Sequence, residues 1–301
     1  MATGSALWAK IWSSRKAYLF LSPLFLGLIL FCYYPPFSGI YHSFFDWDSV
    51  GKAVYVGLDN YRELFRDQVF LNSIPTAFLI LVPRLIIGIV VPLIAAEMIF
   101  NVRQKKLQSA YRVLVLLPIV APGVVGLLIW KNIYDPTNGL LVSLLRGTGL
   151  IAPDRVIDWL GSADLIIPSI IFMGFPWIGG TSVLIYMAGL MNISSEVIES
   201  SELDGAGLLR RIWHIDLPHL MGQVRFFLIF GIIGGLQDFG IQIVLTSGGP
   251  GYSTYVPAYY MYIEAFTAGR MGYATTIGTV MFAAIFLLSL IAYRGMKTET
   301  N

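Results

Sequence analysis

Long apolar stretches, separated by shorter polar segments, run along most of the chain. A helix needs about 20 apolar residues to cross the hydrocarbon layer of a membrane. Six stretches reach that length, the first interrupted by Pro35 and Pro36 near its outer end: 17–41, 73–100, 109–134, 165–190, 224–245 and 272–293. Their apolar residues are continuous rather than alternating, which favours helices over a membrane β-barrel. The pattern therefore predicts an all-α polytopic membrane protein with six transmembrane helices.

The composition is typical of a chain that is solvated by lipid. Of its 301 residues, 56% are hydrophobic and 13% are charged, whereas soluble domains carry about 25% charged residues. The formal charge of +2 gives no basic or acidic excess, so the sequence indicates no nucleic-acid partner. No tandem repeat, low-complexity segment or second domain is evident, and we expect a single transmembrane domain over residues 1–301.

The Lys and Arg residues between the stretches predict the orientation, because cytoplasmic loops carry an excess of them. With the N-terminus inside, the inner segments hold twelve: Lys10, Arg15, Lys16, Arg103, Lys105, Lys106, Arg112, Arg210, Arg211, Arg225, Arg294 and Lys297. The outer segments hold seven: Lys52, Arg62, Arg66, Lys131, Arg146, Arg155 and Arg270. This bias places both termini and the loop 191–223 in the cytoplasm.

The sequence lacks the common motifs of catalytic and cofactor sites. It has no GxxxxGK[ST] loop for ATP phosphates, no His-Glu-x-x-His metal pattern and no Gly-x-Ser-x-Gly nucleophile turn. Its three histidines are scattered, and Cys32 is its single cysteine. We therefore predict no catalytic residue, no metal site and no cofactor on this chain.

The predicted cytoplasmic loop 191–223 is longer than a simple connection, which needs only a few residues. Ser194 or Ser195 can cap a first short helix, and Gly205 and Gly207 interrupt it. A second short helix, closed by Pro218, then presents an apolar stripe while Arg210 and Arg211 point elsewhere; the stripe is Leu208, Leu209, Ile212 and Trp213. Such a stripe needs a partner surface or lipid headgroups, and these residues alone leave both alternatives open.

The same loop carries a spaced motif. It has Glu199, then Asp204-Gly205-Ala206, and finally Ile215-x-Leu217-Pro218. These positions resemble the signature loop of permease subunits of binding-protein-dependent ABC importers, in which Glu-Ala-Ala precedes Asp-Gly-Ala and Ile-x-Leu-Pro. Ser200 and Ser201 replace the two alanines, and because serine is also small, the close helix approach is kept.

The resemblance implies a transporter of several chains in a bacterial cytoplasmic (inner) membrane. The partners it implies are a second homologous permease, two ABC ATPase subunits that carry ATP and Mg, and an extracellular or periplasmic solute-binding protein. In this family the short helix after the turn inserts into a groove on the ATPase. The implied ATPase-coupling residues are Glu199, Asp204, Gly205, Ala206, Leu208, Leu209, Ile212 and Pro218. Gly205 would let the chain reverse, because only Gly readily adopts positive φ.

Other segments point to one branch of that family. Val56-Gly-Leu-Asp-Asn-Tyr61, Leu117-Pro118 and Leu245-Thr-Ser-Gly-Gly-Pro250 resemble motifs of the carbohydrate-uptake, maltose-type permeases. In that branch a sugar lies near the membrane midplane between an aromatic face and amide side chains. Two segments align with those that hold the sugar, and they imply Gly174, Trp177, Gln237 and Asp238 as substrate-binding residues, with Asp238 where the family has an amide.

Two charges lie deep inside the predicted membrane helices. Arg84 is eleven residues from Ser73, about 16 Å along a helix, and Asp238 is also well inside its span. A charge at the centre of a membrane helix costs about 2.5–3.5 kcal/mol on insertion scales, so it usually faces a cavity or a partner. Either the two residues form an ion pair or one binds substrate, and Arg84 would suit an acidic sugar or a phosphate. Glu97 can reach headgroup water near the inner end of its helix and receives no role.

We therefore expect a non-catalytic permease subunit that moves a sugar or oligosaccharide, an acidic sugar being one option, by alternating access. The alternative from another class is an ion-gradient-driven secondary transporter. Such proteins often show inverted repeats and intramembrane carboxylates. This sequence has no convincing repeat, and Asp238 is its single deep carboxylate.

Overall fold

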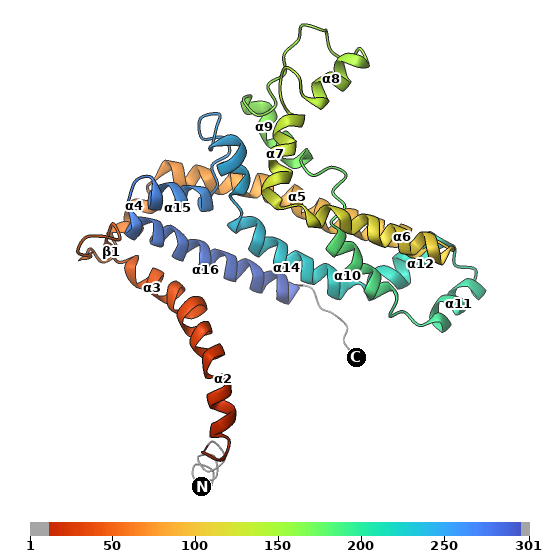
Figure 1. Cartoon of the computed structure of the whole chain (residues 1–301), viewed down its shortest axis with the longest axis horizontal. Coiled ribbons are helices and arrows are strands. Elements are labelled where there is room, and N and C mark those ends of the chain that lie inside the picture. Colours follow the sequence, from red (N-terminus) through yellow and green to blue (C-terminus); the bar gives the residue numbers. More distant parts are fainter. Residues whose placement is uncertain (1–11, 296–301) are drawn as a thin grey trace. The chain divides into compact units, whose positions relative to one another are not determined.

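The computed structural model describes residues 12–295, so Lys10 and Lys297 of the orientation count lie outside the described residues. Internal contacts divide the chain into two compact units, Met1–Phe65 with Met261–Val280, and Arg66–Tyr260 with Met281–Asn301. Helices α15 (Pro257–Phe266) and α16 (Met271–Gly295) contribute residues to both units. The helices are labelled in Figure 1.

The first unit begins with one continuous helical run, Arg15–His42. It consists of α2 (Arg15–Gly27), a π-helical stretch (Leu28–Tyr33) and α3 (Tyr34–His42). The expected interruption at Pro35 and Pro36 is absent, because these prolines stand in the first turn of α3 and their missing N–H groups are tolerated there. The π-helical stretch, with its wider i→i+5 bonding, leads into that turn.

Polar side chains anchor the loop that follows in the first unit. This loop contains an antiparallel pair of short strands and one helix: β1 (Phe45–Asp46), β2 (Val54–Tyr55) and α4 (Asp59–Leu64). The buried Asn60 side chain donates from Nδ2 to the carbonyl oxygens of Ser43 and Phe45, both at 3.0 Å. Thr276 donates from Oγ1 to the same Ser43 carbonyl at 3.0 Å. These bonds fix the backbone at the start of the loop to α4 and α16.

The second unit holds the remaining elements. They are α5 (Gln68–Phe100), α6 (Lys105–Leu116), the 3₁₀ turn η2 (Leu117–Val120), α7 (Gly123–Ile133), α8 (Leu140–Gly147), α9 (Ala163–Phe172), α10 (Gly180–Leu190), α11 (Ser195–Leu203), α12 (Leu208–Arg211), the π-helix η3 (Ile212–Asp216), α13 (Leu217–His219), α14 (Met221–Gln237) and the π-helix η4 (Gln242–Thr246). The 33-residue α5 packs against α6, α9, α10 and α14, and its run beside α6 and α10 is visible in Figure 1. The two-residue strands β1 and β2 are the sheet structure of the described residues, so the fold is all-α as predicted.

Three of the predicted membrane stretches are not continuous helices, and one of them, 224–245, is interrupted at Asp238 and Phe239. In 109–134 the axes of α6–η2 and α7 differ by 88°, and Pro122, which has no N–H to continue the helix, is the N-cap of α7. In 165–190 the segment 173–179 is irregular and separates α9 from α10. Among the described residues, four helical runs are individually long and apolar enough to cross a membrane. The number rises to six if each of two bent pairs is one span, the pairs being α6–η2 with α7 and α10 with α11, whose axes differ by 74°.

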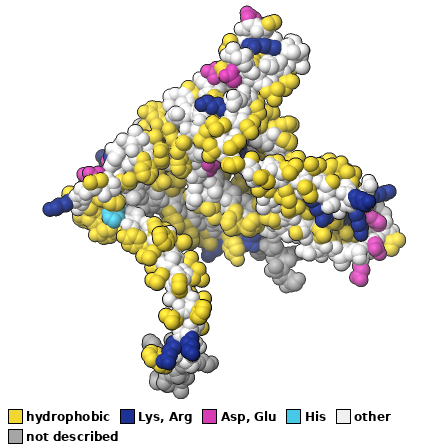
Figure 2. Space-filling model, viewed as in Figure 1, with side chains coloured by type: hydrophobic (Ala, Val, Ile, Leu, Met, Phe, Trp, Pro, Cys, Tyr) yellow, Lys and Arg dark blue, Asp and Glu magenta, His cyan; other side chains and the backbone are white. Residues whose placement is uncertain are grey.

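Much of the exposed surface is apolar. Hydrophobic side chains cover long parts of the face in Figure 2, whereas charged side chains gather toward loops and helix ends. None of the apolar window within Arg15–His42 is buried. A water-soluble protein rarely exposes apolar patches of this extent, so these faces fit a lipid environment or contacts with other membrane helices.

The core of the second unit joins α5, α10 and the start of α14. It includes Ala96, Val183, Tyr186, Leu190 and Leu220, each no more than 1% exposed. At the start of α10, buried Gly180 lies against the backbone of α6, and a Cβ there would overlap the carbonyl oxygen of Val115. Because backbone cannot rotate away as a side chain can, only glycine fits at this contact.

Gly180→Ala should therefore destabilise the second unit, because overpacking of this kind costs about 1–3 kcal/mol. The matched control is Gly126→Ala in α7, where an added Cβ has no neighbour within 4 Å. Thermal unfolding in detergent should show a lower midpoint for Gly180→Ala and an unchanged midpoint for Gly126→Ala. Equal midpoints for the two variants would contradict the close contact.

Candidate functional site

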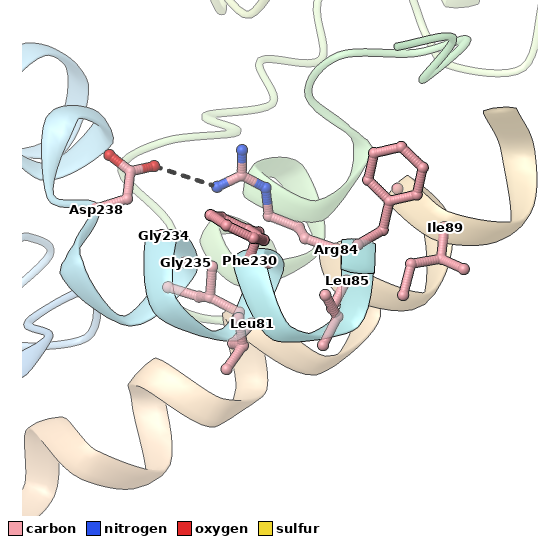
Figure 3. A pocket seen from close by; sticks show the side chains of 12 residues that line it. Leu81, Arg84, Leu85, Ile89, Phe230, Gly234, Gly235 and Asp238 are labelled. Carbon is pink, nitrogen blue, oxygen red and sulfur yellow. Dashed lines mark ion pairs between the residues drawn. The ribbon is translucent and has the colours of Figure 1, made fainter. Parts of the chain in front are cut away.

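A cavity of about 450 Å³ lies between α5 and α14. Glycines make this helix pair approach closely: a Cβ on Gly231 would overlap the Leu85 side chain, and one on Gly235 would overlap Leu81. Small residues four apart are a common means of close packing between membrane helices. The lining residues are Ile80, Leu81, Arg84, Leu85, Gly88, Ile89, Phe227, Phe230, Gly231, Gly234, Gly235 and Asp238, and Figure 3 shows Leu81, Leu85 and Ile89 on α5 opposite Phe230, Gly234 and Gly235 on α14.

The two deep charges meet in this otherwise apolar cavity. Arg84 Nη1 lies 3.9 Å from Asp238 Oδ2 (Figure 3), and the two side chains are 39% and 49% exposed. Asp238 follows the last residue of α14 in extended backbone, and its Oδ1 accepts a hydrogen bond from Gly240 N at 3.0 Å. The carboxylate is therefore held by the break in the helix. The pair is long for an ion pair, and both groups keep open surface.

The other candidate substrate residues do not line this cavity. Gln237 is exposed at the end of α14. Trp177 lies in the irregular segment between α9 and α10, where its Nε1 donates to the Ile171 carbonyl at 3.2 Å and its ring meets Phe172 and Phe175 edge-on. Gly174 has φ of 97° and Trp177 has φ of 57°. Positive φ is natural for glycine but uncommon for a bulky residue, so surrounding structure holds Trp177 in this conformation.

The predicted coupling loop forms a helix–turn–helix, here called the coupling segment (Ser194–His219). Ser194 caps α11, its Oγ accepting from Val197 N at 3.4 Å. Gly205, with φ of 74°, reverses the chain: its N–H and that of Ala206 bond to the carbonyls of Glu202 and Ser201, a Schellman turn. The predicted cap and the reversal at Gly205 are therefore present.

The exposed face of the coupling segment carries most of the predicted motif. Glu199, Asp204, Gly205, Leu208, Leu209, Trp213 and Pro218 are exposed, whereas Ala206 and Ile212 are half-buried. One expectation fails: Pro218 does not close the second helix, because it stands in the first turn of α13, where its missing N–H is tolerated. The helical path continues through η3 and α13 to α14, with Leu220 as the junction.

Sequence reasoning missed a buried polar network at the base of the coupling segment. Arg211, expected only to point away from the stripe, is 8% exposed; its Nε donates to Asp216 Oδ2 at 3.0 Å and its Nη2 to Asn101 Oδ1 at 2.6 Å. Asn101 in turn donates from Nδ2 to Glu97 Oε2 at 3.3 Å. Glu97 is 6% exposed, so the expectation that it reaches headgroup water is wrong: α10 and the coupling segment cover this end of α5.

Arg211 and Asp216 are five residues apart, and the π-helix explains why this spacing did not predict their ion pair. Residues five apart lie about 140° apart around an α-helix and do not face each other. A π-helix bonds residue i to i+5, which brings Arg211 and Asp216 to one side. Asp216 is fully buried, and its Oδ1 has no hydrogen-bond partner among the described residues, so its charge depends on Arg211.

Comparison with known proteins then gives the family. The family model described as "Binding-protein-dependent transport system inner membrane component" matches residues 88–297 of this chain. The chain belongs to this family. The resemblance of the coupling loop to ABC importer permeases is thereby confirmed, and nothing in the family assignment supports an ion-gradient-driven secondary transporter.

Relatives of the permease extend over nearly its whole length. The probable ABC transporter permease protein YurN of Bacillus subtilis (strain 168) is 33% identical over 282 residues, covering 93% of this chain and 96% of that protein. The diacetylchitobiose uptake system permease protein NgcF of Streptomyces coelicolor is 29% identical, covering 89% and 80%. A chain of the bacterial alginate ABC transporter, solved with an alginate pentasaccharide-bound periplasmic protein, superposes with a TM-score of 0.85 at 24% identity, covering 98% and 99%. The permease is thus a multi-pass inner-membrane component of a binding-protein-dependent transport system.

The buried network of this permease makes a stability prediction. Arg211→Met leaves the Asp216 carboxylate buried and unpaired, which should destabilise the protein by about 3–5 kcal/mol. Arg210→Met, at the exposed neighbouring arginine, should change stability by less than about 0.5 kcal/mol. The double variant Arg211→Met/Asp216→Leu should recover most of the loss, because the Asp216 carboxylate is removed together with its partner. Denaturation in detergent measures all three, and equal stability of the two single variants would refute the role of the network.

Proposed function

We propose that this permease is one subunit of an ATP-driven importer that moves a sugar or oligosaccharide through the membrane by alternating access. The observation that carries the proposal is the coupling segment, whose signature motif lies on an exposed, capped helix–turn–helix. The expected assembly pairs the chain with a second homologous permease and two ABC ATPases that bind ATP and Mg. A solute-binding protein would deliver the substrate, as the periplasmic protein in the alginate complex suggests.

The topology that goes with this function is a single transmembrane domain over 1–301 with six spans and both termini in the cytoplasm. The four long helical runs would be four of the spans, and α6 with η2 and α7, bent by 88°, would supply a fifth. Helices α9 and α10, which the irregular segment 173–179 separates, would together supply the sixth. Lipid tolerates irregular backbone only where protein or a water-filled cavity covers it. The fully unburied Arg15–His42 run fits contact with lipid or the second permease.

The ATPase would dock on the exposed turn of the coupling segment. Leu208 is 52% exposed and Leu209 is 73% exposed, and apolar side chains this open on a capped turn need a partner surface. Glu199, Asp204, Gly205, Ala206, Ile212 and Pro218 complete the proposed docking residues. Gly205 and the two flanking helices fix the shape of the turn, so it would move as a rigid body.

This docking proposal predicts a difference between two glycines in one turn. Gly205→Ala places a Cβ at positive φ, which costs about 1–2 kcal/mol, or roughly a tenfold loss of the docking conformation. Gly207→Ala is the control, because its φ is −66° and a Cβ there meets nothing within 4 Å. The measurement is the amount of co-expressed ATPase that co-purifies with each variant. A second variant, Leu209→Asp, places a charge on the exposed apolar turn and should also lower the amount of bound ATPase. If Gly205→Ala and Leu209→Asp both retain as much ATPase as Gly207→Ala, the docking surface lies elsewhere.

The substrate would bind in the cavity between α5 and α14 and at the neighbouring breaks in the spans. Arg84 and Asp238 supply its charges, and Gly174, Trp177 and Gln237 are the further proposed contacts. The unusual φ of Trp177 fits a ring held in place for a function, because such backbone conformations gather at binding sites. Since Arg84 keeps exposed surface beside an unusually long ion pair, it can offer hydrogen bonds to a carboxylate. The acidic polysaccharide alginate, which the solved bacterial importer takes up, carries carboxylates of this kind.

If the substrate is acidic, Arg84 should favour its uptake over that of a neutral oligosaccharide. Arg84→Gln should lower uptake of a uronate oligosaccharide about 10- to 100-fold, because a charged hydrogen bond contributes about 1.5–3 kcal/mol. Uptake of a neutral oligosaccharide of the same length should stay near that of the wild type. Transport assays with radiolabelled sugars on Arg84→Gln and on Asp238→Asn measure the contribution of each charged residue to uptake. Unchanged uptake of both substrates by Arg84→Gln would end the hypothesis of an acidic substrate.

A further inference from the structure

We propose that Arg211 is a positioning residue that ties the inner end of α5 to the coupling segment, so that both walls of the cavity move with it. The inference rests on the proposed function, because it assumes that an ATPase moves the coupling segment. It concerns residues outside the signature motif: Arg211, Asp216 and Asn101.

The two cavity helices are attached to the coupling segment in different ways. Helix α14 is attached covalently, since the helical path runs from Asp216 through α13 and Leu220 into Met221. Helix α5 lies far away in sequence, and its C-cap residue is Asn101. The hydrogen bond from Arg211 Nη2 to Asn101 Oδ1, at 2.6 Å, bridges 110 residues of chain. Without it, only side-chain packing would couple α5 to the coupling segment.

The packing between α5 and the coupling segment is incomplete beside the Arg211–Asn101 hydrogen bond, here called the polar tie. An apolar groove of about 530 Å³ separates the inner end of α5 from the coupling segment, with Leu93 and Met98 on one side and Leu209 and Trp213 on the other. Glu97 and Asn101 also line this groove. Close-packed interiors transmit displacement because they contain few voids. A groove of this size cannot do so. Elsewhere Ile198 and Ile215 of the coupling segment pack against a buried cluster that includes Ala96 and Ile99 of α5, and the polar tie adds a directional connection where the groove interrupts that packing.

The contacts of the Arg211 guanidinium group fix its orientation. Asp216 holds its Nε, Asn101 accepts from its Nη2, and the Phe100 ring lies 6.0 Å from its guanidinium carbon. The planar guanidinium presents its donors in a rigid fork, so two partners at once fix its orientation. Asn101 is fixed in turn, because its Nδ2 donates to the Glu97 carbonyl at 2.8 Å. A buried pair often stabilises no better than apolar residues of the same volume, so a directional role explains this network better than stability does.

The two charged residues of the cavity lie at equal distances along their helices from the coupling segment. Arg84 lies 17 residues before Asn101 on α5, and Asp238 lies 17 residues after Met221, the first residue of α14. At 1.5 Å per residue, each charge is about 25 Å from the coupling segment. If both helices move with the coupling segment, the distance between Arg84 and Asp238 is kept while the cavity reorients. If only α14 follows, the pair is pulled apart.

The experiment measures substrate uptake per ATP hydrolysed by the complete transporter in proteoliposomes. Asn101→Leu removes the tie but keeps the Arg211–Asp216 pair, and Arg211→Met/Asp216→Leu removes the tie without leaving Asp216 unpaired. Both should keep ATPase association and ATP hydrolysis within twofold of the wild type and lower uptake per ATP at least tenfold. Arg210→Met, the matched control, should behave as the wild type. Uptake per ATP equal to that of Arg210→Met in both variants would overturn the inference.

A distance measurement tests the tie directly. Nitroxide labels on exposed positions, Met98 of α5 and Glu202 of α11, report whether the two elements move together in a Cys32→Ser background. Their separation should be the same with and without ATP in the tied protein and should change with ATP in Asn101→Leu. A separation that is independent of ATP in both proteins would overturn the inference. If the wild type neither binds the ATPase nor imports sugar, the proposed function itself fails, and this inference with it.

Discussion

The close approach of α5 and α14 is the contact on which the rest of the candidate site depends. In lipid, two apolar helices gain little by hiding from their surroundings, so they associate through van der Waals packing at small residues. Gly231 and Gly235 supply that packing by leaving room for Leu85 and Leu81. The same approach brings Arg84 and Asp238 within 3.9 Å. Each of these charges is costly in a membrane alone, and they are tolerated because they share a cavity.

Breaks in the membrane helices shape the surroundings of this cavity. Helix α14 ends at Gln237, and the helical turns before and within η4 resume after the extended Asp238 and Phe239. Helix α7, which starts after the bend at Pro122, packs against η4. Backbone groups freed by such breaks need protein or water as partners. A group of interrupted spans is therefore the arrangement expected for a substrate path rather than for a rigid anchor.

At the opposite end of α5, polar chemistry replaces small-residue packing. The coupling segment presents its apolar turn outward, while Arg211 reaches inward to Asp216 and Asn101. In the proposed function the two faces have different tasks: the outer one would offer a surface to the ATPase, and the inner one would fix the segment to the helix that lines the cavity. One long helix thus contains both the site of the deep arginine and the attachment point of the coupling segment, which gives a physical route between the two.

The sequence by itself determined the membrane class, most helix positions and the coupling turn. Continuous apolar runs dictate helices in lipid, and the Ser194 cap and Gly205 reversal follow from local backbone chemistry. Tertiary structure alone decided the rest. The meeting of Arg84 with Asp238 depends on how two distant helices pack, and the Trp177 conformation depends on the break between α9 and α10. The pairing of Arg211 with Asp216 needed a π-helix, whose five-residue register has no simple sequence pattern, and its bond to Asn101 spans 110 residues. Local rules act within a few residues, whereas burial and charge pairing are settled only when remote segments meet.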